Sequence, residues 1–79
     1  MVLYFFHIRD GETLEQDLEG SEFETLELAM ADARLAAREI MADKVMAGYE
    51  PDGQSFEIAD AEGRLRATVP FRSAIKPGG

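Results

Sequence analysis

The chain has 79 residues, of which 46% are hydrophobic and 30% are charged. This length supports one soluble domain, because two smaller cores would each bury too little apolar surface to stay folded. It contains no cysteine, which excludes disulfides, thiolate metal sites and cysteine nucleophiles. Sixteen acidic residues against eight basic ones give a net charge of -8, which opposes nonspecific binding to nucleic acid and to anionic membranes.

The longest apolar run, from Met1 to Phe6, is far shorter than the ~20 residues that a membrane-spanning helix needs. We also expect that it is not a secretory signal, because no basic segment precedes it in this sequence and no polar break with a small-residue cleavage site follows it. We therefore expect no membrane partner.

The first element is a strand over Val2 to Ile8, where every residue except His7 is apolar or aromatic. This composition predicts a strand in the middle of a sheet. Alternation directs the more apolar side of the strand toward the core: Val2, Tyr4, Phe6 and Ile8. Leu3 and Phe5 then point outward with His7 and Arg9, and we expect the acidic segment, a second subunit or another protein to cover them.

Asp10 and Gly11 form a turn dipeptide, and the stretch from there to Phe23 predicts a short edge strand and a loop. A long helix follows from Leu26 to about Ala47. Thr25 is its expected N-cap, and Gly48 is its expected left-handed stop.

The last elements are two strands, Ser55 to Ala59 and Arg64 to Val69, joined by the short turn 60–63 into a hairpin. The inward side of the second strand holds Leu65, Ala67 and Val69, and the strand ends at Pro70. Arg64 and Arg66 face outward, where we expect them to pair with Glu57. The predicted fold class is α+β, with one long helix on a small antiparallel sheet in residues 1–76 and a flexible tail at 77–79.

The helix carries two apolar stripes. One faces the sheet: Leu26, Met30, Ala33, Ala37, Ile40 and Met41. The other lies on the opposite side, which should be polar on a helix that covers a lone sheet: Leu28, Ala31, Leu35, Ala42 and Met46. The second stripe predicts an interface centred on Leu28, Leu35 and Met46, with scattered surface residues as the open alternative.

The whole net charge lies in one segment, because residues 10–27 contain eight acids and no base. Four of these acids form a candidate docking site for a basic partner: Glu12, Glu15, Asp17 and Glu19. A solvated face that keeps the protein soluble is the alternative. The spacing of these acids does not fit an EF-hand loop, and we expect no metal site.

His7 is the only histidine in the chain. A catalytic role would pair it with a carboxylate such as Asp10, whereas a structural role would have it order the turn at Asp10 and Gly11. No serine lies in a glycine-flanked nucleophile turn. We therefore assign no catalytic residue and no cofactor, and keep His7 and Asp10 as the weaker functional candidates.

Several stretches resemble one family of small alphaproteobacterial proteins, catalogued as a domain of unknown function. They are the opening Tyr4-Phe5-Phe6-His7-Ile8-Arg9-Asp10-Gly11, the acidic Asp17-Leu18-Glu19-Gly20, the alanine-rich helix and the closing Ala67-Thr68-Val69-Pro70-Phe71. The resemblance covers nearly the whole chain and implies a bacterial, cytoplasmic protein. It implies no activity, ligand or catalytic residue.

These observations favour a non-catalytic interaction or regulatory module that acts through protein contacts, with a homodimer or another, basic protein as partner. Two alternatives stay open. One is a small enzyme that uses His7 with a nearby carboxylate. The other is a nucleic-acid binder that uses the C-terminal basic residues Arg64, Arg66, Arg72 and Lys76, against the repulsion of the acidic segment.

Overall fold

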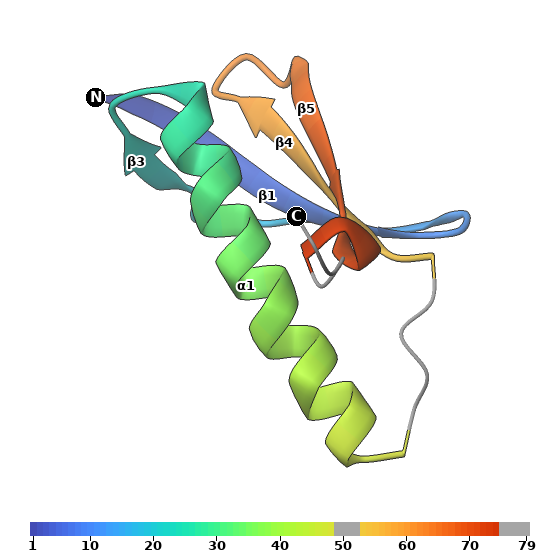
Figure 1. Ribbon diagram of the computed structural model, residues 1–79. Coiled ribbons are helices and arrows are strands. Elements are labelled where there is room, and N and C mark those ends of the chain that lie inside the picture. Colours follow the sequence, from blue (N-terminus) through green and yellow to red (C-terminus); the bar gives the residue numbers. More distant parts are fainter. Residues whose placement is uncertain (49–52, 75–79) are drawn as a thin grey trace.

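The computed structural model describes residues 1–48 and 53–74 of the chain. The strands are β1 (Val2–Asp10), β2 (Thr13–Glu15), β3 (Ser21–Phe23), β4 (Ser55–Asp60) and β5 (Leu65–Pro70). The long helix α1 covers Leu26–Met46, and a short 3-10 helix, η1, covers Phe71–Ala74. Figure 1 shows α1 lying across one face of the sheet. The predicted α+β class and order of elements are confirmed, while the predicted tail at 77–79 lies outside the described residues.

All five strands belong to one antiparallel sheet, in which β1 is a central strand as predicted. On one side β1 pairs with β4, which pairs in turn with β5. On the other side β2 pairs with Ile8–Asp10, and β3 pairs with Val2–Tyr4. The sequence predicted one short edge strand and a loop here. The structure instead has two short strands along this edge, and residues 16–20 cross the gap between them.

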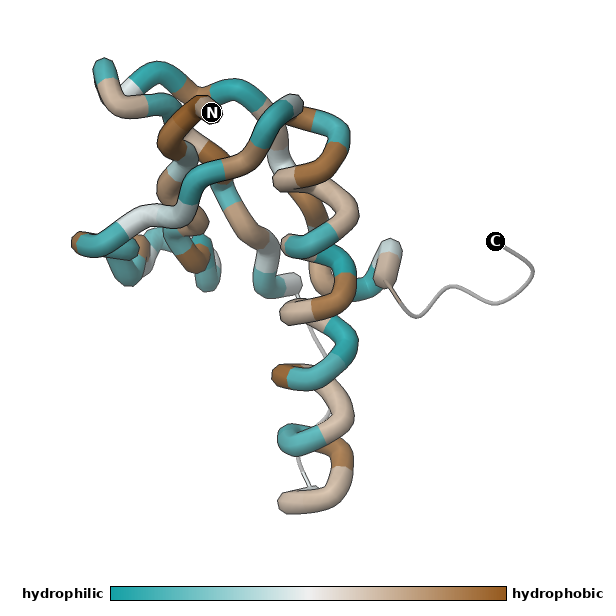
Figure 2. Tube along the Cα trace, turned by 90° about the vertical axis from the view of Figure 1, so that its left-hand side faces the viewer, coloured by the Kyte–Doolittle hydropathy of each residue, from teal (hydrophilic) through white to brown (hydrophobic). Residues whose placement is uncertain are grey.

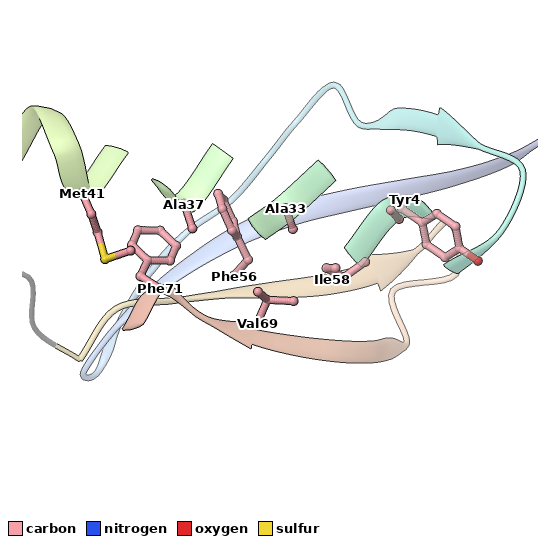
Figure 3. Packing of buried hydrophobic residues seen from close by; sticks show 9 residues of the cluster. Tyr4, Ala33, Ala37, Met41, Phe56, Ile58, Val69 and Phe71 are labelled. Atoms are coloured by element: carbon pink, nitrogen blue, oxygen red, sulfur yellow. The ribbon is translucent and has the colours of Figure 1, made fainter. Parts of the chain in front are cut away.

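The core lies between α1 and the sheet (Figure 3). Ala29, Ala33 and Ala37 are fully buried, and their spacing of four places them in one row on the helix, where small side chains let the helix backbone approach the strands. Bulky side chains fill the space opposite this row: Tyr4, Phe56, Ile58, Val69 and Phe71. The predicted inward stripe is confirmed, although it lacked Ala29.

Both predicted ends of α1 are confirmed. The backbone N–H of Leu28 donates to the Thr25 hydroxyl at 3.1 Å, which satisfies one of the free donors of the first turn. Gly48 has a φ of 92°, the left-handed conformation in which helices often end. Figures 1 and 2 both show the C-terminal end of α1 extending past the sheet, so this part of the helix has a larger free surface than the rest.

The hairpin of β4 and β5 departs from the predicted alternation at one point. Ala59 lies opposite Leu65 and Ile58 lies opposite Ala67, so Arg66 is an extra residue in a β-bulge. Because the bulge shifts the register, Leu65 does not join the core as predicted and is 60% exposed. Val2 also fails to reach the core and is exposed, although its neighbours on the same side of β1 do so.

Candidate functional site

The outer face of α1 keeps its apolar character in the folded protein. Leu28, Leu35 and Met46 are 51%, 57% and 88% exposed, and Ala31 and Ala42 are exposed between them. We call these five residues the outer stripe. A helix that covers one sheet normally presents charged and polar residues on this side, whereas the outer stripe is apolar surface that the described part of the chain leaves exposed.

The sequence prediction omitted Val45, which is 56% exposed. It lies one residue before Met46 and three after Ala42, so ordinary helical spacing could have placed it beside them. Together with Arg38 and Met41, these residues line a shallow groove near the C-terminal end of α1. Apart from the Arg38 side chain, the lining is apolar, which suits contact with another apolar side chain.

Charges of opposite sign border the outer stripe. Arg34 and Arg38 lie along one border, with Glu27 at its N-terminal end, and Asp32, Glu39 and Asp43 lie along the other, all of them exposed. Figure 2 shows polar residues alternating with apolar ones along the exposed helix. An apolar strip between charged borders is typical of a helix that packs against a partner helix.

The predicted interface residues Leu3 and Phe5 are half-buried and lie on the sheet face away from α1. A Cβ built on Gly20 would come within 2.9 Å of the Phe5 ring and 3.0 Å of a Leu3 methyl group, so the backbone of Gly20 already packs against both side chains. The Phe5 ring also stacks on His7, with centroids 6.3 Å apart. The acidic segment thus supplies part of the cover, and a partner on Leu3 and Phe5 stays a prediction.

The segment that covers them is fastened to the edge of β1 by Asp17. One carboxylate oxygen accepts the backbone N–H of Phe6 at 3.0 Å, and the other accepts those of Glu19 and Gly20 at 3.2 Å. Burial opposes ionisation and raises the pKa of Asp17, but these three donors and the nearby His7 outweigh it, so the pKa lies below its ordinary value. Asp17 therefore has a structural role, and the docking prediction now rests on Glu12, Glu15 and Glu19, which are exposed.

The structural interpretation of His7 predicted that it orders the turn at Asp10, but the imidazole has a different partner. Its Nδ1 accepts the backbone N–H of Asp17 at 3.0 Å. Asp10 is three residues further along β1, so its side chain points to the opposite face of the sheet, and it accepts instead from Nε2 of Gln54 at 3.3 Å. The catalytic pairing of His7 with Asp10 therefore has no geometric support.

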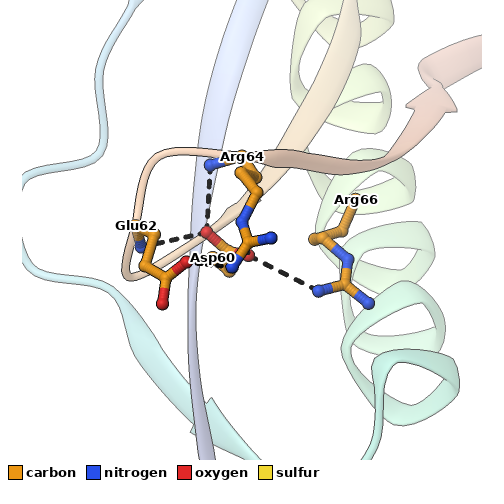
Figure 4. Close-up of polar contacts among 4 residues, drawn as sticks. All are labelled: Asp60, Glu62, Arg64 and Arg66. Atoms are coloured by element: carbon orange, nitrogen blue, oxygen red, sulfur yellow. Dashed lines mark hydrogen bonds and ion pairs between the residues drawn. The ribbon is translucent and has the colours of Figure 1, made fainter.

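Arg64 and Arg66 of the hairpin pair with Asp60 (Figure 4). The expected pairing with Glu57 is therefore wrong. One oxygen of Asp60 accepts the backbone N–H groups of Glu62 and Arg64 at 2.9 Å, which closes the turn, while the other faces the guanidinium groups of Arg64 and Arg66 at 3.6 and 3.4 Å. The hydrogen bond from Arg64 contributes most to lowering the pKa of Asp60.

Glu57 has a different partner. It pairs with Arg9 of β1 at 2.8 Å, and this side-chain hydrogen bond lowers the pKa of Glu57. Arg64 also pairs with Glu62. The nucleic-acid alternative thus loses Arg64 and Arg66 as free cations, and its Lys76 lies outside the described residues.

Among residues 1–48 and 53–74, no three carboxylate or imidazole side chains are grouped so that they could hold a metal ion. Within the same ranges, no helix combines the length and the apolar character needed to cross a membrane.

The fold and its outer stripe define a small α+β domain, in which one helix covers a five-stranded antiparallel sheet and leaves an apolar face outward. The family model of a domain of unknown function, DUF6894, matches residues 3–72, and the chain belongs to this family. No curated protein and no solved structure matches the chain. The resemblance drawn from the sequence is confirmed at the level of the family, while the alphaproteobacterial origin stays a prediction.

Proposed function

We propose that this protein is a non-catalytic interaction module that binds a protein partner through the outer stripe of α1. The observation that carries the proposal is the exposure of Leu28, Leu35 and Met46 on a helix whose opposite face already fills the core. Exposed apolar side chains grouped along one helix face are typical of binding surfaces, because desolvating them stabilises a complex.

The chemistry of the described side chains agrees with a role in contact and not in catalysis. His7 accepts a backbone hydrogen bond through Nδ1, and both oxygens of Asp17 accept backbone N–H groups. These side chains hold one segment of the chain against another. Asp17 held in this way is a weak candidate for a general base, which must present a free proton acceptor to a substrate.

The proposal is tested by placing a photo-crosslinking amino acid at Leu35 and expressing the protein in its native cells. A covalent adduct of defined mass should form at Leu35. The matched control is Leu18, which is 84% exposed but lies outside α1, in the segment between β2 and β3. Equal labelling at both positions, or no adduct at Leu35, would contradict the proposal.

A second arm separates the module from the enzyme alternative. His7→Gln keeps a polar side chain of similar reach in β1 and leaves the outer stripe unchanged. The adduct at Leu35 should therefore form as in the unmodified protein. If His7→Gln abolishes a cellular activity of the protein without lowering its stability, the enzyme alternative replaces the proposed function.

A further inference from the structure

We propose that the partner of the outer stripe is a second copy of this chain, with the two α1 helices side by side and parallel across a two-fold axis. This inference rests on the proposed function and specifies its partner. It is carried by three features of α1: its charge balance, the arrangement of its borders and the self-complementary character of the outer stripe.

The charge balance of α1 differs from that of the protein as a whole. Its 21 residues contain four acids and three bases, a net charge of -1, whereas the whole chain carries -8. Two copies that met through their acidic segments would repel strongly. Two copies that meet along α1 bring together charges that nearly cancel, so this face permits association of an acidic protein with itself.

The borders of the outer stripe favour a parallel arrangement. In a parallel pair of helices related by a two-fold axis, each border of one helix lies beside the opposite border of the other. The arginines of one copy then lie beside the acids of the second copy, on both sides of the contact. An antiparallel pair would instead place Arg34 and Arg38 against the same two arginines of the second copy, and acids against acids, which costs stability.

The spacing along the borders matches a parallel pair in register. In such pairs the residue just before a seam residue, the g position of the heptad, lies beside the e position of the next heptad on the facing helix. When Leu28 and Leu35, seven residues apart, meet their own counterparts, Arg34 and residue 39 occupy these two border positions, so Arg34 faces Glu39 of the second copy.

The same spacing sets Glu27 against Asp32 of the second copy, and these like charges repel. The favourable pairs therefore belong to the C-terminal part of the helix. Figure 1 shows that this part extends past the sheet. Two helices meet most easily there, because the strands of neither copy stand beside the contact.

The outer stripe itself fits a two-fold axis. Across a parallel axis each residue meets its own counterpart, so Leu35 packs on Leu35 and Leu28 on Leu28, while Ala31 and Ala42 let the two backbones approach between the larger side chains. Ordered contacts of this kind supply most of the affinity, because ion pairs at the border of an interface contribute little.

The lack of native cysteine makes the direction of the helices directly measurable. Leu28→Cys and Ala42→Cys are made as separate full-length variants, with Leu18→Cys as an exposed control outside the outer stripe. In a parallel dimer each of the first two variants forms a disulfide with itself under mild oxidation. In an antiparallel dimer neither does so alone, and only a mixture of the two crosslinks.

Sedimentation equilibrium measures the association itself. The unmodified protein should be a dimer at high micromolar concentration, and Leu35→Glu should raise the dissociation constant at least about 100-fold while circular dichroism shows an unchanged fold. Leu18→Glu is the matched control and should leave the dissociation constant unchanged. Leu35 is exposed in the single chain, so Leu35→Glu leaves the core intact.

Charge reversal tests the arrangement independently. Arg34→Glu and Glu39→Arg should each raise the dissociation constant about tenfold, and the double variant should restore it to within about threefold. Glu12→Arg, an exposed change in the turn between β1 and β2, should have little effect.

Three results would overturn the inference: a monomer at every concentration, crosslinks confined to the mixture of cysteine variants, or tighter association on Arg34→Glu. A monomer that still gives a photo-adduct with a different protein at Leu35 would overturn the dimer and leave the proposed function in place. The absence of any adduct at Leu35, with a dimer absent as well, would remove both.

Discussion

The backbone N–H of Asp17 donates to Nδ1 of His7 at 3.0 Å, and the Asp17 carboxylate accepts the backbone N–H of the residue before His7 at the same distance. These reciprocal contacts hold residues 16–20 against the edge of β1, in the gap that β2 and β3 leave open. A carboxylate here takes the place of a strand partner, since a backbone donor in a sheet would otherwise need one.

The first prediction concerns the charge of Asp17. Its pKa is lowered in the folded protein, so its ionised form stabilises the fold above the ordinary pKa of aspartate, about 4, and that contribution is lost as the pH falls below this value. Asp17→Asn should therefore lower the free energy of unfolding by about 1 kcal/mol at pH 7, the low end for a charged hydrogen bond because the side chain is partly exposed. The difference should shrink as the pH falls below about 4.

Urea denaturation of both proteins from pH 2 to pH 7 measures this. Glu19→Gln is the control, because it removes an exposed carboxylate two residues away and should change the free energy by less than about 0.5 kcal/mol at either pH. A loss for Asp17→Asn that is independent of pH would mean that its charge is not what stabilises the segment.

The second prediction separates the two oxygens of Asp60. Asp60→Asn keeps an oxygen that can accept from Glu62 and Arg64 in the turn but loses the charge that faces Arg66, whereas Asp60→Ala loses both interactions. The urea midpoint at pH 7 should fall in the order unmodified protein, Asp60→Asn, Asp60→Ala. Because the pKa of Asp60 is lowered in the folded state, the gap between the unmodified protein and Asp60→Asn should close as the pH falls below about 4. Equal midpoints for the two variants at pH 7 would show that the turn hydrogen bonds contribute nothing.

The third prediction compares two isoleucines. Ile58 of β4 is fully buried between the helix and the sheet, and Ile58→Ala should cost ~2 to 5 kcal/mol. Ile40 belongs to the inward stripe of α1 but is half-buried, so Ile40→Ala should cost less than about 2 kcal/mol. Ile58→Val, at about 0.5 to 1.5 kcal/mol, keeps the comparison measurable if the alanine variant unfolds. A larger loss at Ile40 than at Ile58 would contradict the packing described for the core.

The sequence predicted those features that depend on neighbouring residues. The cap at Thr25, the stop at Gly48 and the buried row that includes Ala33 all follow from local spacing, and the structure confirms them. Alternation likewise predicted the two strands of the hairpin.

The prediction failed where contacts join distant parts of the chain. The carboxylate of Asp17 reaches a donor eleven residues away, and Arg9 pairs with Glu57 forty-eight residues away. Neither contact leaves a periodic signal. The β-bulge at Arg66 could not be predicted either. An inserted residue reverses the alternation beyond it, and alternation alone cannot locate the insertion. The outer stripe could be predicted because apolar residues on the helix face away from the sheet recur at helical spacing, which is a local pattern.

The last prediction concerns the binding of basic partners to the acidic segment. Amide replacement at Asp17 would disturb the fold, so Glu12, Glu15 and Glu19 are replaced by glutamine together and Asp17 is kept. The probe is an oligolysine peptide. Its binding should weaken for the triple variant at low salt and become the same for both proteins at high salt, since exposed charges are screened over about 8 Å at physiological ionic strength.

The matched control replaces three exposed acids outside both the docking residues and the outer stripe, Glu22, Glu24 and Glu62, by glutamine, which changes the net charge by the same amount. If the segment is a docking site, the first triple variant binds the peptide more weakly than the control. Equal weakening would show that the peptide responds to net charge alone, and the three glutamates would then serve as a solvated face.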